Sequence, residues 1–236
     1  MRIEVISNVN EARADRITHR TAIVIDVLRA TSTIVAALEA GSAGILPVET
    51  VLEARTLQRP SDLLAGERFC RKIAGFDLGN SPPDFIPETV KNRRIILTTT
   101  NGTRAMQKAL RADTVLAGSL TNGSACAKAA IDFRRDIVLI CSGSHDEFAL
   151  EDGLCAGFII DRLLAFASTN VEIDDFGTAM LGYYRNTAGR ITDALLGSTT
   201  GRRLVKMGYA RDIDHCAKSD CCAVVPKLQG DTLVLG

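Results

Sequence analysis

The sequence has no tryptophan, and its 236 residues include only eight phenylalanines, three tyrosines, six prolines and three histidines. It also lacks a long apolar run, because Asp161 and Arg162 interrupt its most apolar segment, Leu154 to Ala167. That segment is shorter than the roughly 20 apolar residues of a membrane-spanning helix. Charge of one sign is not in excess, since 28 basic residues balance 28 acidic ones. A general nucleic-acid or anionic-membrane binder would carry a basic excess, so we expect neither partner.

Several motifs are missing as well. The chain contains no G-x-G-x-x-G and no G-x-x-x-x-G-K-[ST], which removes the main support for a nicotinamide or P-loop nucleotide site. It contains no C-x-x-C and no H-E-x-x-H, and the spacing of His215, Cys216, Cys221 and Cys222 fits no standard zinc site. The seven cysteines are odd in number and irregularly spaced, which is typical of free thiols in a reducing compartment. We therefore expect a cytoplasmic protein without disulfides.

Short apolar runs alternate with helical patterns along most of the chain. This alternation predicts an α/β fold, specifically a three-layer α/β/α arrangement with a mainly parallel sheet. No linker divides residues 1–236, so we predict a single domain and leave open a C-terminal subdomain from about residue 170. Residues 66–87 hold three of the six prolines with several glycines, and they read as a long ordered loop. The predicted strands are 3–6, 22–28, 45–48, 63–65, 94–99, 114–117, 137–141, 223–226 and 233–235, and the predicted helices are 30–40, 51–58, 103–111, 124–133, 151–167, 175–196 and 201–206.

Four strand-to-helix turns are rich in small polar residues. In open α/β sheets, ligands bind at the carboxyl ends of strands, and helix N-termini present free backbone N–H groups that suit anions. Serine, threonine and asparagine are also the usual helix caps, so a single turn of this kind indicates little. Four on one sheet, with Asp26 and Arg29 in the first, favour an anion site. The turns are 26–32, 98–103, 118–122 and 141–144.

Asp26 follows an apolar strand directly. A carboxylate is unusual at such a buried position and indicates a specific role. It is a metal ligand, a catalytic acid or base, or a buried partner of Arg29. Other charged residues lie in or beside loops that could meet it at the same edge, although each alone is typical of a solvated charge or a helix cap: Glu67, Arg68, Asp77, Glu151 and Asp152. His145 lies near this edge too and is a candidate for proton transfer.

In order along the chain, several short motifs resemble the 2-phosphosulfolactate phosphatase family. The match is strongest from Val24 to Asp152 and looser from Gly201 to Val225. The motifs are 24–33 (VIDVLRATST), 66–68 (GER), 75–82 (GFDLGNSP), 98–103 (TTTNGT), 118–120 (GSL) with Asn122, and 148–152 (FALED).

The resemblance implies a magnesium-dependent acid phosphatase that hydrolyses 2-phospho-3-sulfolactate in coenzyme M biosynthesis. It thus implies a small anionic phosphomonoester as substrate. Mg²⁺ prefers oxygen ligands, usually one or two carboxylates with water and phosphate. Asp26 is the first candidate ligand, with Glu67, Asp77 or Asp152 as the second. Arg29 and Arg68 would clamp the phosphate and sulfonate as bidentate donors.

Further substrate contacts are expected from Thr31, Ser32, Thr100, Asn101, Gly102, Thr103 and Asn122. The sequence leaves open whether a metal-activated water or the Asp26 carboxylate attacks phosphorus. It also leaves open a non-catalytic α/β protein, or one acting differently, that binds another anionic phosphorylated metabolite. Whether the chain forms a homo-oligomer is equally open.

Overall fold

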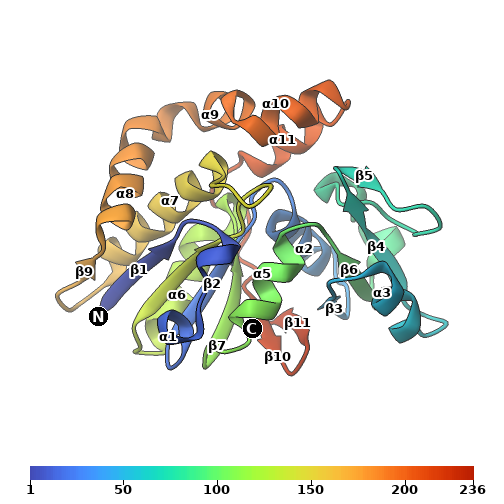
Figure 1. The fold of residues 1–236 in the computed structure, drawn as a ribbon, viewed down its shortest axis with the longest axis horizontal. Coiled ribbons are helices and arrows are strands. Elements are labelled where there is room, and N and C mark those ends of the chain that lie inside the picture. The colour runs from blue at the N-terminus through green and yellow to red at the C-terminus, as the bar shows by residue number, and fades with distance from the viewer.

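The computed structural model describes residues 1–236 and contains one sheet of eleven strands with helices on both faces (Figure 1). The strands are β1 (Arg2–Ile6), β2 (Thr21–Ile25), β3 (Gly44–Pro47), β4 (Leu63–Arg68), β5 (Arg71–Lys72), β6 (Arg94–Thr98), β7 (Thr114–Gly118), β8 (Ile137–Cys141), β9 (Glu172–Ile173), β10 (Pro226–Gln229) and β11 (Thr232–Leu235). Their order across the sheet is β5-β4-β6-β3-β11-β10-β7-β2-β8-β1-β9.

The α-helices are α1 (Ala14–Ile17), α2 (Ala30–Glu39), α3 (Val51–Leu57), α4 (Pro87–Val90), α5 (Gly102–Ala109), α6 (Gly123–Asp132), α7 (Leu150–Phe166), α8 (Asp175–Thr187), α9 (Ile191–Gly197), α10 (Thr199–Lys206) and α11 (Ala210–Cys216). Short 3-10 turns lie at Val9–Glu11, Pro82–Asp84, Leu120–Asn122 and Ala188–Arg190. None of the helices is both long enough and apolar enough to cross a membrane.

Strand β2 shows why the central strands read as continuous apolar runs. All five of its residues are buried, because helices cover both faces of the sheet. Ile23 and Ile25 pack in the cluster that includes α6 and α7, whereas Ala22 and Val24 pack in the cluster that includes α2 and α5. This alternation follows from the two-residue period of a strand. The predicted three-layer fold is confirmed.

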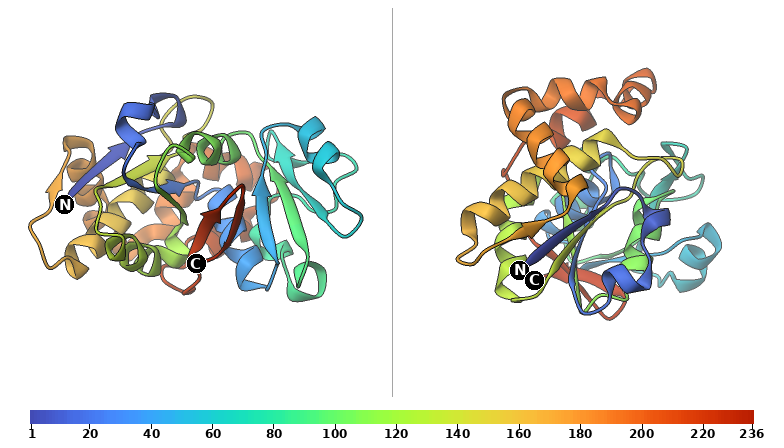
Figure 2. Two further views of the ribbon diagram at one scale, coloured as in Figure 1. Left: turned by 90° about the horizontal axis from the view of Figure 1, so that it is seen from below. Right: turned by 60° about the vertical axis from the view of Figure 1, so that its left-hand side comes forward.

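The C-terminal hairpin β10–β11 lies in the middle of the sheet. It is antiparallel to both neighbours, β3 and β7, whereas the other long strands pair in parallel. Figure 2 shows the red hairpin beside β3. It therefore joins two groups of parallel strands, β3, β4 and β6 on one side and β1, β2, β7 and β8 on the other. Before the hairpin, α9, α10 and α11 cross one end of the molecule, above the strands in Figure 1. The C-terminal subdomain stays a prediction.

The segment 66–87 is more regular than expected. β4 extends through Gly66 to Arg68, and a tight turn at Phe69 and Cys70 leads into β5. Both turn residues have positive φ, the backbone that a two-residue hairpin turn requires. Gly66 is a strand residue: its φ is +148°, and an added Cβ would lie 2.0 Å from the Thr98 carbonyl oxygen. The glycine thus permits close approach of β4 and β6. The strand predicted at 223–226 was wrong, since β10 begins only at Pro226, and no element was predicted for residues 210–216, which form α11.

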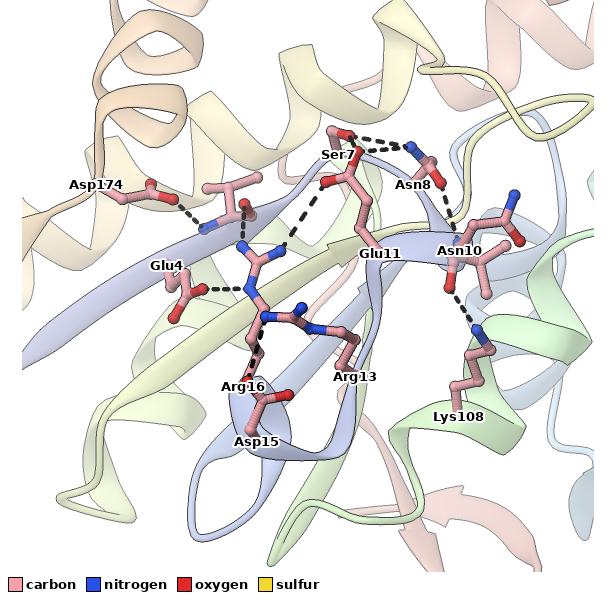
Figure 3. A network of polar contacts seen from close by, with 12 residues as sticks. Glu4, Ser7, Asn8, Asn10, Glu11, Arg13, Asp15, Arg16, Lys108 and Asp174 are labelled. Carbon is pink, nitrogen blue, oxygen red and sulfur yellow. Dashed lines mark hydrogen bonds and ion pairs between the residues drawn. The ribbon is translucent and has the colours of Figure 1, made fainter.

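Polar contacts tie β1 and the segment after it to the rest of the fold (Figure 3). Nε of Arg16 lies 2.5 Å from a Glu4 carboxylate oxygen, and Arg20 pairs with the other oxygen. Nζ of Lys108 on α5 donates to the Val9 carbonyl at 3.0 Å. Arg104 on the same helix binds Asn10. These contacts fix α5, whose first residue lies beside the site described below.

Candidate active site

One polar pocket lies where the two strand groups approach each other. It is enclosed by the turns after β2, β6 and β8, the β4–β5 turn, and the beginnings of α7 and α10. Three of the four polar turns singled out in the sequence therefore converge, and the turn after β7 does not. Most lining side chains are polar: Asp26, Arg29, Glu67, Asn80, Thr99, Thr100, Asn101, Ser144, His145, Glu151, Asp152, Thr200 and Arg203, with Leu28, Phe69, Cys70 and Gly143.

Four buried carboxylates line this pocket: Asp26, Glu67, Glu151 and Asp152. Three of them are held by backbone N–H groups. Asp26 accepts from Ala30 at 3.1 Å, Glu67 accepts from Thr100 and Cys70 at 2.8 and 2.7 Å, and Asp152 accepts from Val27 and Gly143 at 2.9 and 3.1 Å. Glu151 is only 3% exposed, and its fully buried Oε2 has no hydrogen-bond partner. Such an orphaned charge is costly unless another group faces it.

The carboxylates raise one another's proton affinity. Burial, with the nearby Glu67 and Glu151, raises the pKa of Asp26 to about 7, although the Ala30 N–H group and Arg29 act against this rise. Burial, together with Asp26 and Glu151, also raises the pKa of Asp152 well above its usual value. Like charges in a dry site disfavour full ionisation. The cluster therefore attracts protons or cations strongly.

Arg29 follows Asp26 by three residues and is 3% exposed. Its Nη1 donates to Oδ2 of Asp212 on α11 at 2.6 Å, and its Nη2 donates to the Cys70 carbonyl at 3.0 Å. The guanidinium carbon also lies 4.5 Å from the centre of the Tyr209 ring. Ser81 donates to the other Asp212 oxygen at 2.7 Å. Arg29 thus lines the pocket, and these partners fix the orientation of its guanidinium group.

Of the predicted substrate contacts, Thr100 and Asn101 line the pocket. Thr100 also donates its hydroxyl to Glu67 at 2.9 Å. Gly102 packs directly behind Asp26, since an added Cβ would lie 2.6 Å from Oδ2 of Asp26 and 2.4 Å from Cβ of Ala30. The turn after β6 therefore touches the turn after β2 through a residue that has no side chain.

Three more predicted contacts support the site without lining the pocket. The Thr31 hydroxyl donates to the backbone carbonyl of Asp26 at 2.8 Å and accepts from the backbone N–H of Asp26 at 3.0 Å. Ser32 donates to the Val27 carbonyl at 2.8 Å. Thr103 exchanges hydrogen bonds with Thr99 across the first turn of α5. These hydroxyls fix the backbone of the two turns instead of facing a ligand.

Three predicted site residues lie away from the pocket. Arg68 ends β4, and its guanidinium donates to the Glu67 and Glu49 carbonyls at 2.8 Å each and to the Thr98 hydroxyl at 2.9 Å. Asp77 is exposed and accepts from the Leu64 N–H at 2.8 Å. Asn122 caps its own turn and donates to the Ala117 and Val224 carbonyls. Each of these three side chains forms hydrogen bonds with backbone groups, and none of them lines the pocket.

Sequence reasoning missed two charged residues of the site, Arg203 and Asp212, and gave no site role to a third. Glu151 was named among the charges that could meet Asp26, but it read as a helix cap. It starts a helix that is apolar on most sides, which was a signal that its first turn is buried. Arg203 and Asp212 lie on α10 and α11 in a polar stretch with no local signal. Only the tertiary fold brings them to residues more than 100 positions away.

The pocket residues fit a divalent cation of the magnesium type. No three His, Cys, Asp or Glu side chains converge in a preformed cage. Mg²⁺, however, usually takes only one or two carboxylates and completes its shell with water and phosphate. Oδ2 of Asp26 and Oε2 of Glu151 accept no hydrogen bond from the protein. Four carboxylates against two guanidinium groups would also repel an anionic ligand unless a cation offsets their charge.

Comparison with known proteins assigns the family. Residues 6–231 match the family model described as 2-phosphosulpholactate phosphatase. A protein of Caldanaerobacter subterraneus subsp. tengcongensis is 41% identical over 214 residues, which cover 89% of this chain and 88% of that one. Proteins of Clostridium beijerinckii and Symbiobacterium thermophilum are 35% and 38% identical, cover 96% of this chain, and are matched over 96% and 99% of their own length. All three are named "Probable 2-phosphosulfolactate phosphatase". The chain therefore belongs to the 2-phosphosulfolactate phosphatase family.

Proposed function

We propose that the chain hydrolyses the phosphate ester of 2-phospho-3-sulfolactate, giving 3-sulfolactate and inorganic phosphate, and that Mg²⁺ is its cofactor. Family membership and the names of the relatives support the substrate. The observation that carries the reaction type is the buried Asp26 at the end of β2, surrounded by Glu67, Glu151 and Asp152. Such a set of carboxylates suits a phosphoryl-transfer site, where charge has to be offset and a nucleophile placed.

The protein groups divide this work among them. Asp26 and Glu151 present the free oxygens that would hold Mg²⁺ together with the phosphate. When bound, the cation would offset the charge of the phosphate and of the carboxylates. Arg29 is positively charged and would donate hydrogen bonds to the negatively charged phosphate. Asp212 would hold its guanidinium in place. Thr100 and Asn101 add hydrogen-bond donors at the turn after β6.

Two routes of attack fit these side chains. In one, the Asp26 carboxylate attacks phosphorus and the resulting acyl phosphate is hydrolysed by water. In the other, a water oriented by the carboxylates attacks directly. Both routes need Asp26 ionised, and both need a proton delivered to the departing sulfolactate oxygen. Trapping of labelled phosphate on the protein separates them, because only the first route forms a covalent intermediate.

The deciding experiment measures phosphate release from 2-phospho-3-sulfolactate and from a panel of other phosphomonoesters. Wild-type protein dialysed against EDTA should be inactive, and Mg²⁺ should restore turnover. Asp26→Asn should lower kcat by several orders of magnitude, and Asp132→Asn, an exposed aspartate on α6, should not change it. Full turnover after EDTA dialysis would refute the role of Mg²⁺. A wild-type protein that binds phosphomonoesters without releasing phosphate would refute the enzymatic role.

A binding measurement tests the cation site independently of turnover. Mg²⁺ that binds only the folded protein raises its melting temperature. We expect this rise for the wild type and for Asp132→Asn, and its loss in Asp26→Asn. The place in coenzyme M biosynthesis and the cytoplasmic location that the sequence implies stay predictions, and the thiol titration described below tests the latter.

A further inference from the structure

Arg203 is a pocket residue that the proposed chemistry does not use. It lies on α10, half-buried, and lines the same cavity as Asp26 and Arg29. It forms no salt bridge, and its side-chain hydrogen-bond partner is Nε2 of His145. A guanidinium can only donate, so Nε2 of His145 accepts. The Cys70 thiol is also within hydrogen-bond reach of Arg203. A guanidinium carries five N–H donors, so further donors remain for a ligand.

Arg203 and Arg29 line the same pocket as Cys70. The Cys70 carbonyl accepts from Arg29 at 3.0 Å. Burial and Glu67 raise the pKa of the Cys70 thiol, whereas Arg29 and then Arg203 act to lower it, in agreement with the shared lining. The pocket thus offers two adjacent cationic clamps. A small ligand with two acid groups on neighbouring carbon atoms could engage both.

The two arginines differ in how their charge is compensated. Arg29 is paired with the buried Asp212, whereas no carboxylate offsets Arg203. None of the four pocket carboxylates forms an ion pair with Arg203, although Glu151 and Arg203 also line a neighbouring hollow together. The unpaired charge of Arg203 would attract a second strong acid group on the substrate.

We propose that Arg203, oriented by His145, binds the second acid group of the substrate, the sulfonate or carboxylate next to the phosphate ester. This subsite rests on the proposed function and assigns to Arg203 the task that the sequence predicted for Arg68. Arg203 is then a specificity-determining residue. His145 acts through it as a positioning residue and is not a proton donor.

The test compares Arg203→Gln with Arg202→Gln, a neighbouring exposed arginine on α10 that does not line the pocket. Three substrates distinguish the acid groups: 2-phospho-3-sulfolactate, 2-phospholactate, which lacks the sulfonate, and glycerol 2-phosphate, which lacks both acids. Losing a charge-assisted clamp should raise KM for phosphosulfolactate roughly 10- to 100-fold. kcat should change little, because this contact is made equally in the ground and transition states. Arg202→Gln should match the wild type on every substrate.

The pattern across substrates decides the assignment. If KM rises for phosphosulfolactate alone, Arg203 holds the sulfonate. If it rises for phospholactate as well, Arg203 holds the carboxylate. An equal loss on glycerol 2-phosphate, or no change on any substrate, would overturn the proposal. His145→Gln, whose amide oxygen can still accept from Arg203, should retain most of the affinity, and His145→Ala should lose part of it.

A binding assay keeps this inference separate from the proposed function. Calorimetry with 3-sulfolactate should show roughly 10- to 100-fold weaker binding to Arg203→Gln, while binding of inorganic phosphate is unchanged. A wild-type protein that releases no phosphate from any ester would refute the proposed function, and calorimetry would still decide the subsite. Unaltered sulfolactate binding by a folded Arg203→Gln would refute the subsite even if turnover is as proposed.

Discussion

Replacing Asp212 by asparagine should both destabilise the protein and slow turnover, because Asp212 holds Arg29 in place. The two side chains are 2.6 Å apart and are 0% and 3% exposed. Asparagine keeps the size of the aspartate and removes its charge. The Arg29 guanidinium then remains buried, with the Cys70 carbonyl and the Tyr209 ring as its partners.

The size of the effect follows from this burial. Removing one partner of a buried ion pair costs about 3–5 kcal/mol, because the other charge stays uncompensated. The carbonyl and the aromatic ring retain part of the stabilisation, so we expect the lower end, about 3 kcal/mol. For a chain of this length, that free energy corresponds to a fall in melting temperature of about 6–12 °C. A clamp that has lost its orientation should also lower kcat by about 10²–10³.

The assay combines thermal denaturation with steady-state kinetics at a temperature where circular dichroism shows every variant folded. Asp214→Asn is the matched control, because Asp214 lies on the same helix and is exposed. If Asp212 acts through Arg29, the double variant with Arg29→Lys should have nearly the kcat of Arg29→Lys alone. Additive losses in kcat would refute this coupling. A melting temperature and a kcat close to those of the wild type would refute the whole argument.

Three further predictions concern other parts of the fold. Gly102→Ala should cost about 1–3 kcal/mol of stability by overpacking and lower kcat by displacing the Asp26 carboxylate, whereas Gly182→Ala, which meets no atom within 4 Å, should do neither in the same melting and rate assays. Burial acts to raise the pKa of Glu4, but hydrogen bonds from Arg20 and Arg16 outweigh it and hold the pKa below its usual value. Glu4→Gln should therefore lose stability at neutral pH, and urea titrations should show its deficit vanishing as the pH falls through the lowered native pKa. Thiol titration should find seven free groups in the unfolded, unreduced protein. In the native protein, the exposed Cys221 should react rapidly, ahead of the half-buried Cys70. Five or fewer free groups after unfolding would contradict a reducing compartment.

The sheet could be predicted because its strands carry a strong local signal. Runs such as 22–25 and 137–141 are rich in β-branched and aliphatic residues on both faces, a pattern typical of a strand covered on both sides. Asp26 could be singled out for the same reason, since a carboxylate at the end of such a run breaks the pattern. The turn after β6 lies at the pocket, as predicted. In the turn after β7, the polar side chains form hydrogen bonds within the turn and do not line the pocket.

The rest of the pocket depends on contacts that no local pattern reports. Arg29 and Asp212 are separated by 183 residues. Arg203 and Asp212 stand in a polar, helical stretch that resembles any solvated surface. Arg68 was misplaced because residues 66–68 read as a loop, in which an arginine would face solvent or ligand. In the structure they are part of a strand, and the side chain turns back to hold three backbone and hydroxyl oxygens.

The division of labour between the two pocket arginines follows from what each one touches. Arg29 has a buried carboxylate, a carbonyl and an aromatic ring as fixed partners, so its charge is already balanced and its position is set before any ligand arrives. Such a group suits the reacting phosphate, where a small displacement costs rate. Arg203 has an imidazole nitrogen as its partner, and no carboxylate pairs with its positive charge. Its side chain has few fixed partners and can adjust its position to a second acid group of the substrate. No protein carboxylate neutralises its charge before the substrate binds. Under the proposed function, the C-terminal helices therefore contribute to both tasks: α11 would fix the clamp that acts on the phosphate, and α10 would supply the clamp that selects the substrate.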